Sequence, residues 1–273
     1  MLLTESFALR TDPSDSRPAR RAIVTGASKG IGRAIAADLA NRGYLVIAAA
    51  RSADLLDTLA RDRDGAEGGV VIHPCDLREM DAAQACVDAA LATFGGLDLI
   101  VHSAGATKRG DFFSLTPEDF VDGFALKFHA AVNMARAAWP HLRASGHGHI
   151  INVIGVGGWT PSADFTIGGP VNSALMNFTK AMADRGLGEG VRVNGINPGP
   201  IETDRLRARF AVAQAESGLS EAAIREQMLV HERVTRFGRP NEIATLVAFL
   251  DSADGAYFHG ALIDLDGGAR KGI

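Results

Sequence analysis

Residues 22–32, AIVTGASKGIG, decide the fold, because a short apolar run leads there into a turn that contains three glycines. The run 22–24 has the apolar character of a buried strand, and helical spacing of apolar residues follows from Ile31 to Arg42, where Gly43 ends it. Glycines in such a turn let the backbone bend tightly and let a phosphate approach the amino end of the next helix. This order favours dinucleotide binding, although ordinary strand-to-helix turns also use glycine.

The alternation of apolar run and helical pattern continues along the chain. Six further runs occupy residues 45–48, 70–72, 97–101, 149–153, 191–193 and 261–265. Nearly continuous apolar strands suit a parallel sheet covered by helices on both faces. We therefore predict one doubly wound α/β domain of about seven strands over residues 21–273, preceded by a flexible tail, residues 1–20. The polar, helical segment 203–233 is predicted to form a lid over a pocket.

Charge and composition exclude several classes of function. The 273 residues carry 28 basic and 32 acidic side chains, a net charge of −4, which gives no electrostatic reason to expect a nucleic-acid partner. The chain shows neither an apolar run of membrane-spanning length nor the residue order of a signal peptide. Its two cysteines are too few for a disulfide scaffold. We expect a cytoplasmic protein without a membrane partner.

The turn at residues 25–32 resembles the T-G-x-x-x-G-I-G cofactor motif of the short-chain dehydrogenases/reductases, and the resemblance covers residues 21–268. Asp76 matches the family's acid beside the adenine ring, and 102–105 (HSAG) stands where the family usually has N-N-A-G. Further matches are 192–194, 197–203, 236–244 and 264–268. The resemblance implies a Rossmann-type sheet and an oxidoreductase acting on a small carbonyl, alcohol or activated C=C substrate.

Charge near the turn indicates which cofactor binds. NAD binders usually place an acid after the second strand, whereas this strand ends in Arg51, and Lys29 lies inside the glycine turn. Both cations could be solvated surface charges, but together they favour NADP(H) over NAD(H). The resemblance implies cofactor contacts from Gly26, Ser28, Lys29, Gly30, Ile31, Gly32, Arg51, Asp76, Leu77, Ser103, Ala104, Gly105, Pro198, Gly199, Ile201 and Thr203.

The family's catalytic set of Asn, Ser, Tyr and Lys is replaced throughout. Gly155 stands at the Ser position, Gly168 at the Tyr position, Asn172 at the Lys position and Lys127 at the Asn position. The family spacing is intact, since the two glycines are thirteen residues apart and Asn172 follows Gly168 by four. The chain has only two tyrosines, and neither Tyr44 nor Tyr257 is expected to reach this centre.

Two interpretations of this replacement remain open. Either catalysis has decayed, or the two glycines leave space beside the cofactor for a substrate that is bulkier or carries its own acid. Lys127 and Asn172 look like an exchanged pair, so Lys127 is a candidate acid or base with a lowered pKa and Asn172 a partner for a ribose hydroxyl. Alternatively, Lys127 extends to solvent. Alternative functions are an NADP(H)-binding sensor or partner subunit, and an isomerase or lyase that uses the emptied pocket.

Other residues are weaker candidates. We expect His102 to be a hydrogen-bonded core histidine, and the group His141, His147 and His149 to lie at the surface, so no metal site is predicted. Helices near 117–143 and 171–186 match those that pair across dimers in the family, which predicts a homodimer or homotetramer. The loop before Gly168 offers Trp159, Ser162, Asp164 and Thr166 as pocket residues.

Overall fold

The computed structural model describes residues 19–271, and the predicted tail lies outside them up to residue 18. All seven strands of the described part pair in parallel in one sheet, in the order β3-β2-β1-β4-β5-β6-β7. The strands are β1 (Arg21–Thr25), β2 (Leu45–Ala50), β3 (Gly69–Pro74), β4 (Leu99–His102), β5 (His149–Val153), β6 (Arg192–Pro198) and β7 (Leu262–Leu265). The predicted doubly wound sheet is confirmed.

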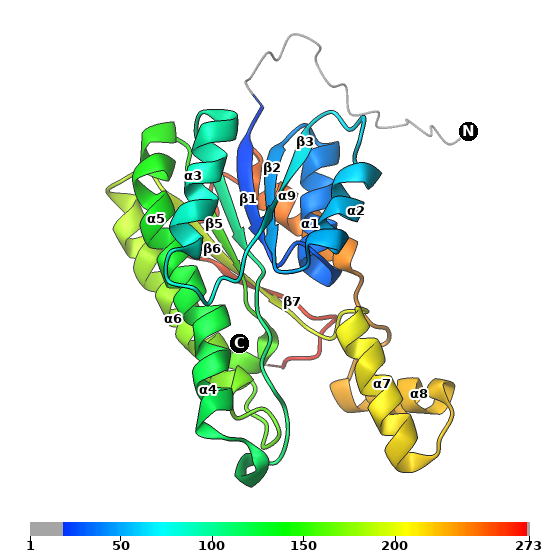
Figure 1. The fold of residues 1–273 in the computed structure, drawn as a ribbon. Helices are drawn as coiled ribbons and strands as arrows, with labels where there is room; N and C mark the ends of the chain where they lie inside the picture. Colours follow the sequence, from blue (N-terminus) through cyan, green and yellow to red (C-terminus); the bar gives the residue numbers. More distant parts are fainter. Residues whose placement is uncertain (1–18, 272–273) are drawn as a thin grey trace, which may run out of the picture.

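Helices cover both faces of the sheet (Figure 1). One face carries α1, α2 and α9, and the other carries α3, α5 and α6. The α-helices are α1 (Gly30–Asn41), α2 (Ala53–Asp62), α3 (Ala82–Phe94), α4 (Pro117–Phe124), α5 (Ala130–Ser145), α6 (Gly168–Leu187), α7 (Asp204–Ser217), α8 (Glu221–Glu232) and α9 (Pro240–Asp251). Short helical turns are η1 (Phe112–Ser114), η2 (Ala125–His129) and η3 (Val156–Gly158). No helix among residues 19–271 is long and apolar enough to cross a membrane.

The strand order places a topological switch point at the carboxyl ends of β1 and β4. Ile23 in β1 pairs with Ile47 of β2 on one side and with Ile100 of β4 on the other. From β1 the chain proceeds to β2 and β3 on one side of the sheet and then to β4, β5, β6 and β7 on the other, so the strand order reverses between β1 and β4. In open α/β sheets ligands bind at such a switch point. The predicted glycine turn begins at this position.

Two segments differ from the simple helix pattern. The helix predicted near 117–143 is divided by η2, a π turn between α4 and α5. The predicted lid consists of α7 and α8, which pack on each other through Leu206, Phe210 and Ile224, with Phe237 from the segment before α9 completing the cluster. Figure 1 shows α7 and α8 standing apart from the sheet, across from α4.

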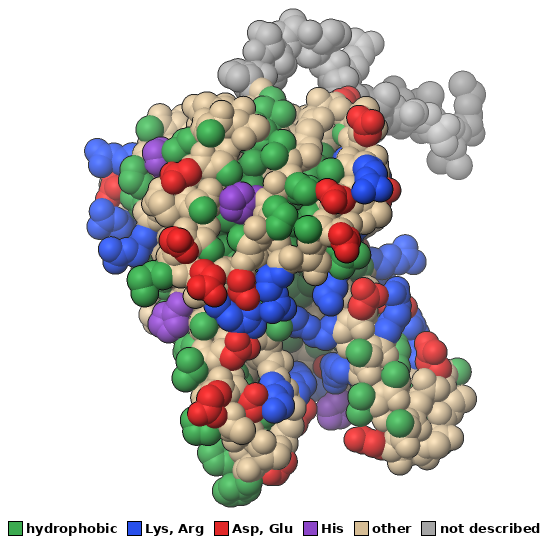
Figure 2. Space-filling view, in the orientation of Figure 1, with side chains coloured by type: hydrophobic (Ala, Val, Ile, Leu, Met, Phe, Trp, Pro, Cys, Tyr) green, Lys and Arg blue, Asp and Glu red, His purple; other side chains and the backbone are tan. Residues whose placement is uncertain are grey.

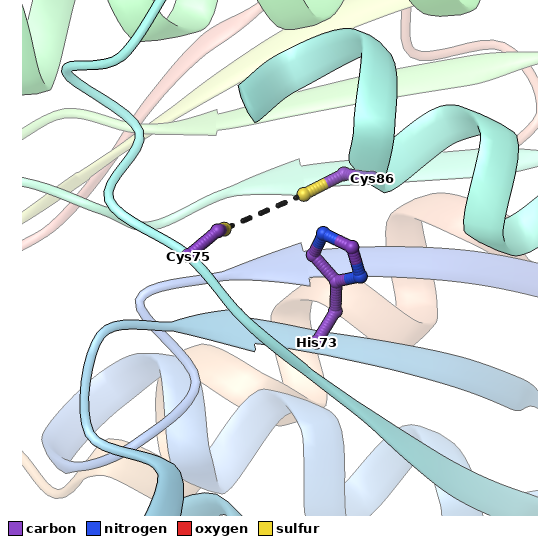
Figure 3. A group of neighbouring side chains, drawn as sticks. All are labelled: His73, Cys75 and Cys86. Atoms are coloured by element: carbon purple, nitrogen blue, oxygen red, sulfur yellow. Dashed lines mark hydrogen bonds between the residues drawn. The ribbon is translucent and has the colours of Figure 1, made fainter. Parts of the chain in front are cut away.

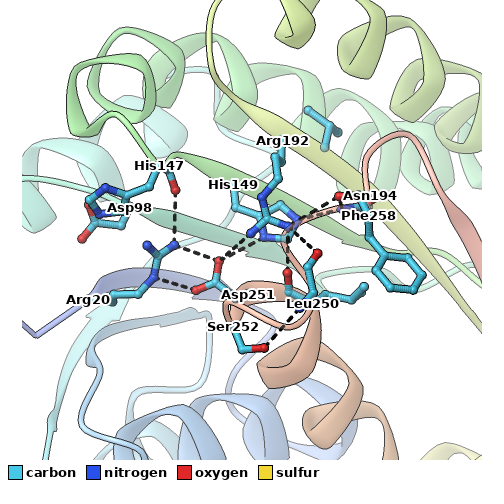
Figure 4. Close-up of polar contacts among 12 residues, drawn as sticks. Arg20, Asp98, His147, His149, Arg192, Asn194, Leu250, Asp251, Ser252 and Phe258 are labelled. Atoms are coloured by element: carbon cyan, nitrogen blue, oxygen red, sulfur yellow. Dashed lines mark hydrogen bonds and ion pairs between the residues drawn. The ribbon is translucent and has the colours of Figure 1, made fainter. Parts of the chain in front are cut away.

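A buried polar network closes the amino end of the sheet (Figure 4). Arg20 donates two hydrogen bonds of 2.8 Å to Asp251, so the start of β1 is fixed to the end of α9 and Arg20 does not belong to a free tail. His149 is completely buried, which corrects the surface position expected for it. Its Nδ1 donates to Asp251 at 3.0 Å, and its Nε2 accepts from Asn194 at 2.9 Å.

Candidate functional site

The glycine turn after β1 packs so tightly against neighbouring backbone that two of its positions have no room for a side chain. A Cβ at Gly26 would lie 2.9 Å from the Cα of Ala104, and a Cβ at Gly32 would lie 2.3 Å from the carbonyl oxygen of Gly26. Gly30 has a φ of +59°, which favours glycine. Helix α1 begins after Lys29 without a side-chain cap, so its first N–H groups remain available to an anion. This cradle fits the pyrophosphate of a dinucleotide.

Thr25 ties the glycine turn to the loop after β4. Its Oγ1 accepts hydrogen bonds from the backbone N–H of Ser103 and Ala104 at 3.1 and 3.0 Å. The hydroxyl lies 3.2 Å from His102 Nδ1, and His102 Nε2 lies 3.2 Å from the carbonyl oxygen of Lys127. Since a carbonyl only accepts, Nε2 carries the proton and Nδ1 accepts from Thr25. Burial lowers the pKa of His102 to about 4, so it is the neutral core histidine that was expected.

The predicted cofactor residues lie at or just after the carboxyl ends of strands. Residues 26–32 follow β1, 103–105 follow β4, and Gly199, Ile201 and Thr203 follow Pro198, the last residue of β6. Arg51 follows β2, and Asp76 and Leu77 follow β3. The structure thus brings them to one edge of the sheet.

The two cations predicted to contact the cofactor, Lys29 and Arg51, are both accessible to solvent. The Arg51 side chain is 62% exposed and its Nη1 lies 3.9 Å from Asp76. Lys29 is also exposed. Asp76 is held mainly by Arg78, whose hydrogen bonds lower the pKa of the carboxyl against the effect of burial. Leu77 is buried in the core, so only its backbone is free to contact a ligand.

Lys127 turns inward at the carboxyl end of β5. Its Nζ donates a hydrogen bond of 2.5 Å to the carbonyl oxygen of Ile154. The aliphatic part lies along Gly105, where an added Cβ would be 3.0 Å from Lys127 Cδ. The residue belongs to the π turn η2, a deformation that is frequent at functional sites. Burial first, and then the charge of Arg205, lower the pKa of Lys127 to about 7.

Asn172 approaches the same stretch of backbone from α6. Its Nδ2 donates to the carbonyl oxygen of Gly155 at 3.4 Å, while its Oδ1 is buried and has no hydrogen-bond partner in the described part of the chain. A buried acceptor without a donor is costly, and a hydroxyl group of a ligand would satisfy it. Lys127 and Asn172 therefore bond to the consecutive carbonyls of Ile154 and Gly155.

The space expected beside the two glycines is not empty. A Cβ at Gly168 would lie 2.0 Å from Cζ of Phe165, so the Phe165 ring fills the volume that a larger residue would use. Gly155 has a φ of +127°, and its added Cβ would lie 3.2 Å from Asn172 Nδ2. The expectation of empty space is therefore wrong at Gly168, whereas the use of this centre by an isomerase or lyase stays a prediction. Phe165 was missed, although a large aromatic three residues before Gly168 was a usable signal of exchanged volume.

Two arginines at the site were also missed. Arg109, from the loop after β4, stacks on Phe165 with its Cζ 3.8 Å from the ring centroid and donates to Asp164 at 2.7 Å. Arg205, in the first turn of α7, donates to the carbonyl oxygen of Gly105 at 2.6 Å. Figure 2 shows Lys and Arg side chains gathered where the surface is hollowed between the α4 part and the α7–α8 part. The sequence carries no local signal for this convergence.

The remaining polar candidates occupy different places. Ser162 donates a hydrogen bond to Asp164, and this contact lowers the pKa of the Asp164 carboxyl. Asp164 also forms an ion pair with Arg109. The hydroxyl of Thr166 is buried without a partner in the described residues. Trp159 is half-exposed and lies under the guanidinium of Arg270, 4.7 Å from its ring centroid.

Neither tyrosine lies at this centre. The hydroxyl of Tyr44 donates to Asp251 at 2.9 Å, at the opposite end of the sheet. Tyr257 is fully exposed between α9 and β7. A tyrosine of this chain therefore does not replace the family's proton donor.

A thiol pair lies near Asp76 (Figure 3). The sulfur atoms of Cys75 and Cys86 are 3.6 Å apart, and His73 brings a third potential ligand within 4.8 Å of both. A metal ion would need thiolates. In the metal-free pair the hydrogen bond with Cys75 and burial raise the pKa of Cys86 far above its usual range, and the same hydrogen bond lowers the pKa of Cys75. We assign this cluster no part in the site.

Comparison with known proteins agrees with this geometry. A family model described as enoyl-(acyl carrier protein) reductase matches residues 26–270. The 4-formylbenzenesulfonate dehydrogenase of Comamonas testosteroni is 32% identical over 248 residues, which cover 90% of this chain and 96% of that protein. The 3-oxoacyl-(acyl-carrier-protein) reductase of Escherichia coli (strain K12) is also 32% identical over 248 residues, with 90% and 96% coverage.

Solved structures show the same fold. The L-sorbose reductase of Gluconobacter frateurii, solved in complex with NADPH and L-sorbose, superposes with a TM-score of 0.89 at 29% identity. The match covers 93% of this chain and 98% of that one. With the motifs, the sheet order and these matches in agreement, the chain belongs to the short-chain dehydrogenase/reductase family.

Proposed function

We propose that the protein is an NADP(H)-dependent oxidoreductase that interconverts a carbonyl group and an alcohol, with Lys127 moving the proton. The observation that carries this proposal is the position of Lys127 Nζ, 2.5 Å from the Ile154 carbonyl. The next carbonyl along the chain, that of Gly155, accepts a hydrogen bond from Asn172. The pKa of the Lys127 ammonium is lowered to about 7. A group with this pKa can both donate and accept a proton near neutral pH.

Binding of NADP(H) is supported by the shape and charge of the strand edge. The cradle formed by Gly26, Gly30 and Gly32 accepts a pyrophosphate, and the exposed cations Lys29 and Arg51 are placed to neutralise a 2′-phosphate. The unpartnered Oδ1 of Asn172 accepts a hydrogen bond from a ribose hydroxyl. The NADPH complex of the L-sorbose reductase supports the same assignment.

The chain's own residues then have distinct tasks. NADP(H), when bound, supplies the two-electron redox chemistry. During reduction, protonated Lys127 gives its proton to the substrate oxygen, which becomes the hydroxyl of the alcohol; during oxidation, neutral Lys127 removes that proton. Phe165 excludes water from the volume above Gly168, which strengthens the polar interactions beside it.

The second candidate is an NADP(H)-binding sensor or partner subunit without turnover. It shares the glycine cradle and the cationic edge, so only a measurement of redox turnover separates the two functions. The lowered pKa of Lys127 favours the enzyme, because a binding protein has no need of a proton carrier at this position.

The test begins with fluorescence titrations of the protein with NADPH and NADH. NADPH should bind at least about tenfold more tightly, and Arg51→Asp should narrow or reverse this difference, because a charge-assisted hydrogen bond to the 2′-phosphate is replaced by repulsion. Arg61→Asp, an equal charge change on the exposed side of α2, is the matched control and should leave the preference unchanged. Equal affinities for the two cofactors would contradict the charge argument.

The second half of the test is turnover. A panel of aldehydes and ketones is incubated with NADPH, and loss of its absorbance is followed. Oxidation of NADPH that depends on both protein and substrate supports the proposed enzyme. Tight binding of NADPH with no turnover over the panel would favour the sensor or partner subunit.

A further inference from the structure

Three cationic side chains converge above the carboxyl ends of β4 and β5. Arg205 hydrogen-bonds the Gly105 carbonyl from one side, and the aliphatic part of Lys127 lies along the same glycine. The charge of Arg205 contributes to the lowered pKa of Lys127, and the charge of Arg109 contributes to the lowered pKa of Arg205. Arg205 therefore lies close enough to influence Lys127, and Arg109 close enough to influence Arg205, although the three residues come from η2, from the loop after β4 and from α7.

The carboxylates nearby do not balance these charges. Within residues 19–271, Lys127 and Arg205 donate to backbone carbonyls and form no ion pair. Asp164 is the one carboxylate bonded to Arg109 in this part of the chain. The acids that flank Arg205 have other partners, since Asp204 pairs with Arg207 and Glu202 with Arg225.

Arg109 and Arg205 are both exposed to solvent, and an anion bound by them would offset the remaining excess of positive charge beside Lys127. The arrangement of the two arginines suits such an anion. The Phe165 ring holds the Arg109 guanidinium by stacking, and the Gly105 carbonyl uses only one nitrogen of Arg205. Each guanidinium has five N–H donors, so both retain donors for a planar oxyanion.

We propose that the substrate of this site carries a carboxylate or a similar oxyanion, bound by Arg205 and Arg109, beside the carbonyl or alcohol group that Lys127 serves. The proposal rests on the proposed oxidoreductase function for the identity of the reacting group. Because Arg205 belongs to α7 and bonds to the loop after β4, an anion bound there also fixes the predicted lid against the body of the protein. A neutral analogue would leave both guanidinium groups without a counter-charge.

The first experiment measures binding without turnover. Benzoate and benzamide are titrated by calorimetry into protein saturated with NADP+. Benzoate should bind about tenfold or more tightly than benzamide, and Arg205→Gln and Arg109→Gln should each remove most of the difference. Arg207→Gln, two residues further along α7 with its side chain 64% exposed, is the matched control and should keep it. Equal affinities for the two probes, or no binding of either, would overturn the proposal.

The second experiment uses turnover of 4-formylbenzoate and its neutral methyl ester with NADPH. The kcat/KM of the acid should be about 10- to 100-fold higher than that of the ester, mainly because its KM is lower. In Arg205→Gln the kcat/KM values of the two substrates should become similar. An equal loss for both substrates in Arg205→Gln would show a merely structural arginine and overturn the proposal. Failure to bind NADPH would refute the proposed function, whereas normal NADPH binding without a preference for the anion refutes this inference alone.

Discussion

The contact between Gly168 and Phe165 gives a quantitative prediction about how this centre is packed. In Gly168→Ala, the new Cβ would lie 2.0, 2.1 and 2.7 Å from three atoms of the Phe165 ring. The ring cannot move freely, because Arg109 stacks on it at 3.8 Å and Gly157 adjoins its Cε1 atom. Overpacking of this kind costs about 1–3 kcal/mol, from which the helix preference of Ala over Gly recovers about 0.5–1 kcal/mol.

The assay is urea unfolding of four proteins: the wild type, Gly168→Ala, Phe165→Ala and the double variant. In the Phe165→Ala background, Gly168→Ala should be neutral or slightly stabilising, so the coupling energy should be about 1–3 kcal/mol. Gly188→Ala is the control, since Gly188 lies at the end of the same helix with φ −82° and nothing within 4 Å of an added Cβ. If Gly168→Ala is equally destabilising with and without Phe165, the packing argument is refuted.

Three further predictions concern other parts of the molecule. Gly155→Ser, which restores the family's residue, should destabilise the protein by about 1–3 kcal/mol in thermal unfolding because φ is +127°, and an unchanged melting temperature would contradict this strain. Burial lowers the pKa of His102 and of His149 from 6.5 to about 4. Between these two pH values the unfolded chain binds more protons than the folded protein, so the free energy of unfolding should decrease as the pH falls from 6.5 to about 4. Urea unfolding at stepped pH that shows constant stability would disprove it. The pairing faces expected on α4–α5 and α6 predict a dimer or tetramer by light scattering, and a monomer at micromolar concentration would contradict that.

The strands and the glycine turn could be predicted because their signals are local. Each strand is an apolar run bounded by polar or glycine residues, and the turn at residues 25–32 needs glycine for reasons of backbone shape alone. The environment of His102 could also be anticipated, since a histidine at the end of a central strand is buried wherever the sheet is covered on both faces.

The missed residues depend on contacts between distant segments. Arg205 reaches the loop that carries Arg109 only because the loop after β4 and the start of α7 turn toward each other, which no periodicity encodes. The burial of His149 depends on Asp251, which lies 102 residues away. The filling of the space at Gly168 depends on the rotamer of Phe165 and on the path of its loop. Side-chain packing of this kind follows from the assembled fold rather than from the sequence pattern.

The most direct test of the account is the pH dependence of kcat for carbonyl reduction in the wild type and in Lys127→Met. Because Lys127 must be protonated to donate, and its pKa is lowered to about 7, the wild-type rate should fall as the pH rises above 7. Lys127→Met should lose at least about a hundredfold in kcat together with this inflection, while NADPH binding persists, and the exposed control Lys271→Met should behave as the wild type. A Lys127→Met protein that keeps both the rate and the pH profile of the wild type would contradict the central claim.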